Sequence, residues 1–132
     1  MTKAELPPST LLVVEDNLHQ RLLYEEELRG EGYSVLTAAD GREALEVAQR
    51  EHPDLVLLDI NMPVMDGLDT LGKLLEVDHR IPVIIHTAYP GYQDSFTSWS
   101  ADAYVMKNSD LTELKQTVQR LLTRDKTLNE EQ

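Results

Sequence analysis

The segment Leu11-Leu-Val-Val-Glu-Asp-Asn17 places four consecutive apolar residues directly before two acidic ones. A strand buried on both faces of a parallel sheet has this continuous apolar character, whereas a half-exposed strand alternates between apolar and polar residues. Four more short runs follow along the chain. The run at 33–38 is more mixed and is expected to lie nearer an edge of the sheet. The other three are nearly continuous and occupy 55–58, 82–87 and 103–106.

Segments with the apolar spacing of amphipathic helices separate these runs. Asn17 is a suitable N-cap for the first helix, which Gly30 and Gly32 are expected to end. Ser109 or Asp110 is expected to cap the last helix, whose spacing is the most regular. The apolar positions are Leu18, Leu22, Leu23 and Leu28, then Ala44, Leu45 and Ala48, then Leu68, Leu71, Leu74 and Leu75, and finally Leu111, Leu114, Val118, Leu121 and Leu122.

Strand runs that alternate with helices predict an α/β fold built from five βα units. Right-handed crossovers place the helices on both faces of a five-stranded parallel sheet, which gives three layers. With 132 residues the chain is expected to form one domain at 10–124, with flexible extensions at 1–9 and 125–132. The segment 89–100 is expected to contain a short or mobile helix.

The composition excludes several classes of function. The chain has 12 Lys and Arg residues against 24 Asp and Glu residues, a formal net charge of -12, and no cysteine. Such a charge repels phosphate backbones, so we expect no direct binding to nucleic acid. Without cysteine there is no disulfide, Cys-ligated zinc or thiol nucleophile. The sequence shows neither a signal peptide nor an apolar run that could span a bilayer, which favours a cytoplasmic domain with no membrane partner.

Polar residues follow the ends of four predicted strands. Glu15 and Asp16 follow the first and Asp59 the third, while Thr87 ends the fourth and Lys107 follows the fifth. Ligands of open parallel sheets bind outside the carboxyl ends of the strands, so these side chains are expected to share one site. Each residue alone also suits an ordinary helix cap or loop position. The agreement among four strand ends favours a site.

Three carboxylates in one site need a compensating cation, because like charges repel and their desolvation is costly. Mg²⁺ takes few protein oxygen ligands and keeps several waters, so it suits this set, and Lys107 adds a further positive charge. A metal ion and an ammonium group beside a carboxylate nucleophile suit the acceptance of a phosphoryl group. Thr87 can then donate a hydrogen bond to a phosphate oxygen.

These residues resemble the response-regulator receiver domains of two-component signal transduction, the CheY-like superfamily. The resemblance covers residues 11–124, nearly the whole chain, and its most specific part is 59–67. It implies a flavodoxin-like sheet with the strand order 2-1-3-4-5. The matching segments are Val13-Val-Glu-Asp-Asn17, Leu57-Leu-Asp-Ile-Asn-Met-Pro-Val-Met-Asp-Gly67, Thr87-Ala88 and Tyr104-Val-Met-Lys107.

The resemblance also implies a role for each matching residue. Asp59 is implied as the phosphoacceptor and as a Mg²⁺ ligand. Asp16 is implied as a second direct ligand, the backbone carbonyl of Asn61 as a third, and Glu15 as a ligand through water. The remaining implied roles are the switch hydroxyl for Thr87, the switch aromatic for Tyr104, the phosphate-binding lysine for Lys107, and the shaping of the loop after the third strand for Pro63 and Gly67.

Two positions depart from the family pattern or lie where the family varies. The family usually has proline after the lysine, but Asn108 stands here, so the turn before the last helix is less constrained. Tyr89 lies two positions after Thr87, where the family varies widely. Together with Asn61, Tyr89 is expected to influence how long a phosphoryl group survives.

The resemblance implies that a histidine kinase or histidine phosphotransfer protein donates a phosphoryl group to Asp59 in the presence of Mg²⁺. Inward movement of Thr87 and Tyr104 would then change the surface formed by the fourth helix, fifth strand and fifth helix, which controls an output protein. Such a domain is a signalling phosphoacceptor that contributes only to its own phosphorylation and dephosphorylation, and it is not an enzyme with a separate substrate. It is expected to be a monomer or weak dimer.

The sequence fits three other functions less well. A degenerate receiver that acts only as a phosphorylation-independent docking module ranks second, with Asn108 as its weak support. A flavin or nucleotide binder would favour an amide-presenting loop after the first strand, but Glu15 and Asp16 occupy that loop. A Mg²⁺-dependent phosphohydrolase would need a further acid–base carboxylate and a substrate cap, which so short a sequence does not suggest.

The remaining histidines and aromatic residues favour structural roles. His86 should point to the opposite face of the sheet from Thr87, as a satisfied histidine beneath a helix. Phe96 and Trp99 are expected to pack a short helix against the sheet, with a partner-binding patch as the alternative. The histidines expected in solvated positions are His19, His52 and His79.

Overall fold

In the computed structural model, five parallel strands form one sheet in the order β2-β1-β3-β4-β5. The structure describes residues 8–59, 67–88, 101–108 and 110–131. The predicted strand order is confirmed, and the mixed second run does form an edge strand. The strands are β1 (Thr10–Val14), β2 (Ser34–Ala38), β3 (Leu55–Leu58), β4 (Val83–Thr87) and β5 (Ala103–Met106).

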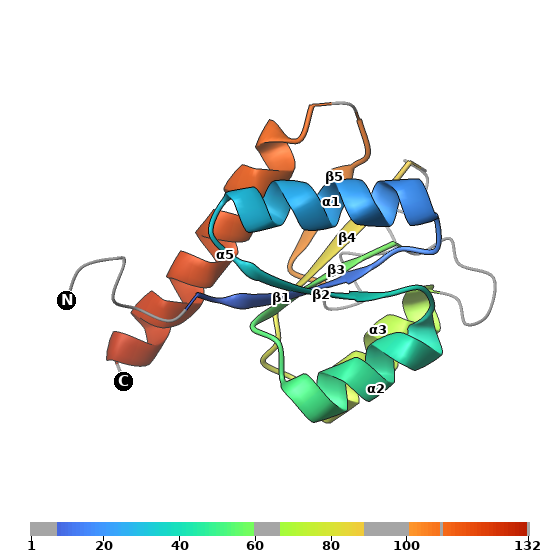
Figure 1. The fold of residues 1–132 in the computed structure, drawn as a ribbon. Helices are drawn as coiled ribbons and strands as arrows, with labels where there is room; N and C mark the ends of the chain where they lie inside the picture. Colours follow the sequence, from blue (N-terminus) through green and yellow to red (C-terminus); the bar gives the residue numbers. More distant parts are fainter. Residues whose placement is uncertain (1–7, 60–66, 89–100, 109, 132) are drawn as a thin grey trace.

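Helices cover both faces of the sheet and complete three layers (Figure 1). On one face lie α1 (Leu18–Gly30) and α5 (Thr112–Glu131), and on the other lie α2 (Gly41–Glu51) and α3 (Gly67–Val77). This confirms the α/β class and the two-sided covering of the sheet. The helix expected within 89–100 lies outside the described residues, as do Phe96 and Trp99.

The central strands are continuous in apolar character because each one feeds two cores. Leu11 and Val13 of β1 join the core beneath α1 and α5, whereas Leu12 and Val14 join the core against α2 and α3. All four residues are at most 1% exposed. Successive side chains of a strand point to opposite faces, so a strand covered on both sides has no solvent-facing position.

Side-chain hydrogen bonds fix where α1, α2 and α5 begin. The Asn17 side chain accepts a hydrogen bond from the Gln20 N–H at 3.0 Å and starts α1, as expected. Asp40 caps α2 in the same way, by accepting from the Glu43 N–H at 2.9 Å. Before α5, Asp110 accepts from the Thr112 N–H, also at 2.9 Å. These bonds satisfy backbone donors that a helix leaves unpaired in its first turn.

The buried face of α1 differs from the expected one. The structure buries Tyr24 and Leu28, which are four residues apart and share one face. Of the four leucines expected to form the apolar face, only Leu28 is buried. The other three are half exposed, because rotation along the helix turns them away from the face that contains Tyr24 and Leu28: Leu18 (53%), Leu22 (51%) and Leu23 (47%).

Helix α5 is longer than the sequence predicted. Helix α5 continues past residue 124 to Glu131, so the segment expected as a tail is helical up to there, and its mobility remains a prediction.

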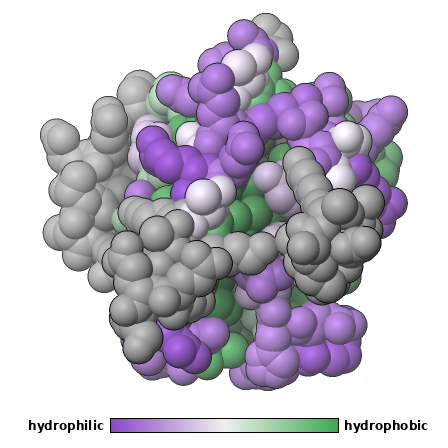
Figure 2. All heavy atoms as spheres, turned by 90° about the vertical axis from the view of Figure 1, so that its left-hand side faces the viewer, coloured by the Kyte–Doolittle hydropathy of each residue, from purple (hydrophilic) through white to green (hydrophobic). Residues whose placement is uncertain are grey.

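On the face shown in Figure 2, the coloured residues are mostly hydrophilic, and hydrophobic atoms show mainly as a narrow band between them. Among the described residues, no helix is long and apolar enough to cross a membrane.

We predict that Leu58→Ala lowers the free energy of unfolding by about 2–5 kcal/mol, since a fully buried leucine leaves a cavity when truncated. The matched control is Leu23→Ala, a half-exposed leucine whose truncation should change stability by less than about 0.5 kcal/mol. Urea unfolding of both variants measures the difference. Equal effects of the two substitutions would contradict the two-sided core described above.

Candidate functional site

An open hollow of about 250 Å³ lies at the carboxyl end of the sheet. Parallel strands all end at this edge, so the residues that follow β1, β3 and β5 converge there. The hollow is polar on most of its lining, in contrast to the apolar cores on the two sheet faces. Its lining residues are Glu15, Asp16, Asn17, Gln20, Asp59, Ala88 and Lys107.

Three carboxylates meet in this hollow. One oxygen from each of Glu15, Asp16 and Asp59 lies within 4.8 Å of the other two. Glu15 and Asp59 are buried, at 2% and 5% exposure, and Asp16 is exposed. The sheet holds the two buried residues by their backbones, because the Glu15 N–H donates to Ala38 O and the Asp59 N–H to Val14 O, each at 3.0 Å. Clustered hard oxygen atoms of this kind suit a divalent cation such as Mg²⁺.

The ammonium group of Lys107 sits among these carboxylates. Its Nζ lies 2.6 Å from Glu15 Oε1, 3.2 Å from Asp59 Oδ2 and 2.7 Å from Gln20 Oε1. A lysine ammonium has three N–H donors, so these acceptors account for all of them. The Lys107 backbone N–H also donates to Thr87 O at 2.8 Å, which ties the end of β5 to the end of β4. Lys107 is therefore anchored at both its backbone and its side chain, although Asn108 follows it.

Burial and charge act in opposite directions on this cluster. Burial raises the pKa of Glu15 from 4.5 to about 7, and the nearby charge of Asp59 adds to the rise, while the hydrogen bond from Lys107 offsets only part of it. Burial would lower the pKa of Lys107, but its hydrogen bond to Glu15 and the charge of Asp59 outweigh that effect and raise it. The lysine therefore stays charged, and the cluster still carries excess negative charge that a metal ion would relieve.

The turn between β1 and α1 is fixed by contacts that the sequence did not reveal. Arg21 Nη1 donates to the carbonyl oxygens of Glu15 at 2.8 Å and Asp16 at 3.4 Å. The second carboxylate oxygen of Glu15 accepts from the Asn17 N–H at 3.1 Å. Gln20 and Arg21 lie in the first turn of α1, just after the Asn17 cap. Polar side chains at such a position can contact the acidic strand end that precedes the helix, and this placement in the sequence could have identified them.

Thr87 and Tyr104 lie on adjacent strands and face the same side of the sheet. Ile85 of β4 belongs to the α2/α3 core, and Thr87 is two residues further along the same strand. Tyr104 pairs with Ile85 in the sheet and packs against that same core. Thr87 is fully buried, while Tyr104 is half-buried and burial raises its pKa. Gly67 begins α3, and Asn61, Pro63 and Tyr89 lie outside the described residues.

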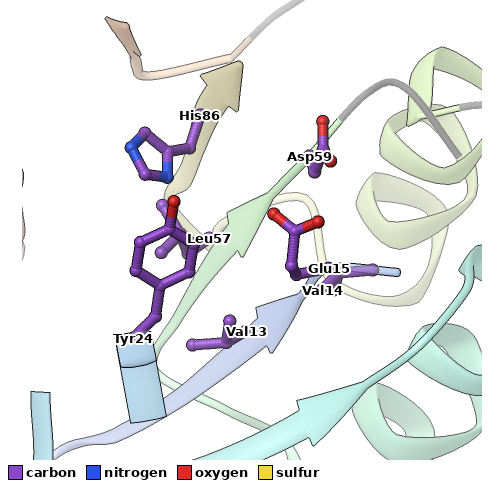
Figure 3. A pocket seen from close by; sticks show the side chains of 7 residues that line it. All are labelled: Val13, Val14, Glu15, Tyr24, Leu57, Asp59 and His86. Atoms are coloured by element: carbon purple, nitrogen blue, oxygen red, sulfur yellow. The ribbon is translucent and has the colours of Figure 1, made fainter. Parts of the chain in front are cut away.

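His86 lies on the other side of the sheet, as expected. Its ring meets Tyr24 of α1 edge-on at a centroid distance of 5.0 Å, and burial lowers its pKa from 6.5 to about 4. Figure 3 shows Tyr24 reaching toward His86, while Glu15 and Asp59 lie close together at the ends of β1 and β3. The space among these side chains is too narrow for a water molecule. His86 is therefore a packed, neutral histidine beneath a helix.

The fold and this site define a small doubly wound α/β protein with an acidic, lysine-bearing pocket at the carboxyl end of its sheet. The family model for the response regulator receiver domain matches residues 11–119. The chain thus belongs to the response regulator receiver family and is a receiver domain of a two-component response regulator.

Relatives from several organisms support this assignment. The chain is 37% identical to Sporulation initiation phosphotransferase F of Bacillus subtilis over 115 residues, which is 85% of this chain and 92% of the relative. It is 40% identical to the probable transcriptional regulator ycf27 of Cyanophora paradoxa over 122 residues, covering 91% of this chain but 51% of that relative. The chain thus spans about half the length of several curated relatives that it matches.

Solved structures give the same result. The response regulator TrrA of Thermotoga maritima, crystallised in complex with Mg²⁺-BeF, superposes with a TM-score of 0.82 at 41% identity, covering 86% of this chain and 98% of that one. TrrA has also been crystallised in complex with the histidine kinase ThkA; in that structure it superposes with a TM-score of 0.80, again covering 86% of this chain and 98% of that one.

We predict that, in excess chelator, Glu15→Gln becomes more stable relative to the wild type as the pH rises from 4.5 to 7. The raised pKa of Glu15 means that the wild-type fold loses stability as this carboxyl ionises, so its contribution is fully present below pH 4.5 and lost through pH 7. The difference has an upper bound of about 3 kcal/mol, since one pKa unit corresponds to about 1.4 kcal/mol. Urea unfolding of both proteins across this range measures it. A difference that does not change with pH would contradict the burial of an ionisable Glu15.

Proposed function

We propose that this receiver domain accepts a phosphoryl group on Asp59 from a phosphohistidine donor in the presence of Mg²⁺. The observation that carries this proposal is the contact of Lys107 Nζ with Asp59 Oδ2, at 3.2 Å, beside two further carboxylates. The buried Asp59 carboxylate lines an open hollow and can act as the nucleophile. The adjacent Lys107 ammonium group can stabilise the negative charge on the incoming phosphoryl oxygens.

The donor set fits the metal. Asp16 and Asp59 would hold Mg²⁺ directly, the backbone carbonyl of Asn61 would add a third oxygen, and Glu15 would act through a water molecule. When bound, Mg²⁺ would neutralise charge on the oxygens of the transferring group. The carboxylate cluster within 4.8 Å supports this assignment, because it holds excess negative charge even with Lys107 present.

The chain's own residues account for the transfer. A carboxylate oxygen of Asp59 attacks phosphorus, an O–P bond forms, and the P–N bond to the donor imidazole breaks with its electron pair left on nitrogen. Lys107 would exchange its bond to Asp59 for one to a phosphoryl oxygen and keep its bond to Glu15. The acyl phosphate carries roughly −1.5 to −2 charges, as other protein phosphate groups do, in place of the single negative charge of the Asp59 carboxylate, so the site gains roughly −0.5 to −1. Thr87, at the end of β4, would donate its hydroxyl to another phosphoryl oxygen.

A histidine kinase or histidine phosphotransfer protein is the proposed donor. The complex of the related TrrA with a histidine kinase supports a donor of this kind. The net charge of -12 supports an output through protein contacts rather than through nucleic acid bound by this domain itself. In this account the domain works in the cytoplasm as a monomer or weak dimer, and it acts on no separate substrate.

We further propose that phosphorylation changes the protein surface through movements of Thr87 and Tyr104. Both side chains face the α2/α3 side of the sheet, on neighbouring strands. Movement of Thr87 toward the new phosphoryl group would free space that the half-buried Tyr104 can enter. The exposed surface around β5 and α5 would then change, and a partner could distinguish the two states.

We predict that Asp59→Asn abolishes acid-labile labelling by a phosphohistidine donor and by a small-molecule phosphodonor, because the amide is a far weaker nucleophile than the carboxylate. Excess chelator should likewise suppress labelling of the wild type. Radiolabel transfer from a histidine kinase measures both effects, and Asp54→Asn, at the opposite end of β3, serves as the matched control. Labelling of Asp59→Asn at the wild-type rate would remove Asp59 from its proposed role, and undiminished labelling in chelator would remove the metal.

We predict that phosphorylation shifts the side-chain NMR signals of Tyr104, since its ring would move inward beside Thr87. Thr87→Ala should reduce the shift, because the hydroxyl that links the phosphoryl group to β4 is lost. Tyr33 provides a reference signal on the opposite edge of the sheet. Unchanged Tyr104 signals in fully phosphorylated protein would overturn the proposed switch.

A further inference from the structure

We propose that Gln20 is a positioning residue for the reaction at Asp59, which it serves by holding the ammonium group of Lys107. This inference rests on the proposed function. Gln20 Oε1 lies 2.7 Å from Lys107 Nζ, a shorter contact than the 3.2 Å between Lys107 Nζ and Asp59 Oδ2. The side chain also lines the hollow that contains the carboxylates.

The position of Gln20 is set by the start of α1. Its backbone N–H donates to the Asn17 side chain at 3.0 Å, which fixes the first turn of the helix next to the end of β1. The Tyr24 hydroxyl, one turn further along α1, lies 3.5 Å from the same Gln20 oxygen. Tyr24 is itself buried and packs against His86, so the Gln20 oxygen that accepts from Lys107 also contacts a well-packed residue.

Gln20 differs chemically from the other two acceptors of Lys107. Glu15 and Asp59 are carboxylates, and both are needed at the acidic cluster, whereas Gln20 is neutral. A neutral acceptor orients the ammonium group without cancelling its charge, so the charge remains available to a phosphoryl oxygen. When the contact with Asp59 is exchanged for the phosphoryl group, Gln20 and Glu15 would keep Nζ in place.

The surrounding sequence gives this contact a particular use. Asn108 follows Lys107, and its side chain accepts from the Asp110 N–H at 2.7 Å instead of restricting the backbone as a proline would. The lysine stem is long and rotatable, and its ordering costs conformational entropy. The hydrogen bond that Nζ donates to Gln20 of α1 restrains the far end of the Lys107 side chain, where no proline restricts the following turn.

The test compares Gln20→Met, which keeps the length of the side chain and removes the acceptor, with Gln49→Met, the same change at an exposed position of α2. Labelling by a small phosphodonor in saturating Mg²⁺ should slow by about three- to tenfold for Gln20→Met, as expected for the net contribution of one ordinary hydrogen bond when Glu15 still accepts from the ammonium group. Gln49→Met should label at the wild-type rate. The Mg²⁺ affinity should be unchanged in both, because Gln20 is not a proposed ligand.

A second measurement separates positioning from general packing. In protein with ¹⁵N-labelled lysine, the Lys107 ammonium signal should be observable in the wild type and in Gln20→Glu, which keeps an acceptor oxygen. It should disappear in Gln20→Met, since exchange with water accelerates when the acceptor is lost. Slower labelling with an unchanged ammonium signal, or a lost signal with wild-type labelling, would overturn the inference. Wild-type protein that fails to label would instead overturn the proposed function, and this inference with it.

Discussion

The charge balance around one ammonium group is the constraint on which the site depends. Lys107 Nζ stands against carboxylates from two other strand ends, and it remains charged because Glu15 and Asp59 favour its protonated form. Removing two buried carboxylates from water is costly unless they are paired or bind a cation. The excess negative charge of the carboxylates is therefore destabilising, and a divalent cation would neutralise part of it.

The fold supplies the precision that this balance requires. Parallel strands end at one edge of the sheet, so residues far apart in the sequence meet there. Glu15 and Asp59 are 44 positions apart and Asp59 and Lys107 are 48 apart, yet both carboxylates lie within hydrogen-bonding range of the Lys107 ammonium group. Apolar cores on both faces hold the strands in register, and the backbone bond from Lys107 to Thr87 fixes β5 against β4. Stability and the acidic site thus use the same strands, with apolar residues along their length and polar ones at their ends.

Much of this architecture was predictable from the sequence. Continuous apolar runs indicated strands buried on both faces, and family resemblance supplied the strand order, which pattern alone does not fix. Residues at strand ends, such as Asp59, were identifiable because topology decides where they lie. Gln20 and Arg21 were not, since their roles depend on how far flexible side chains reach across the β1–α1 turn. The exposure of Leu22 was also missed, because several apolar residues on α1 competed for one buried face.

The central claim is that the -12 charge of this chain includes a small cluster built to accept one phosphoryl group on Asp59. The most direct test is to phosphorylate the protein with a histidine kinase and Mg²⁺, reduce the acyl phosphate with borohydride, and locate the reduced residue by mass spectrometry of its peptides. Homoserine is expected at position 59, with Glu15 and Asp16 unchanged, and no conversion is expected when Mg²⁺ is chelated. Conversion at another aspartate, or none at Asp59 in phosphorylated protein, would contradict this claim.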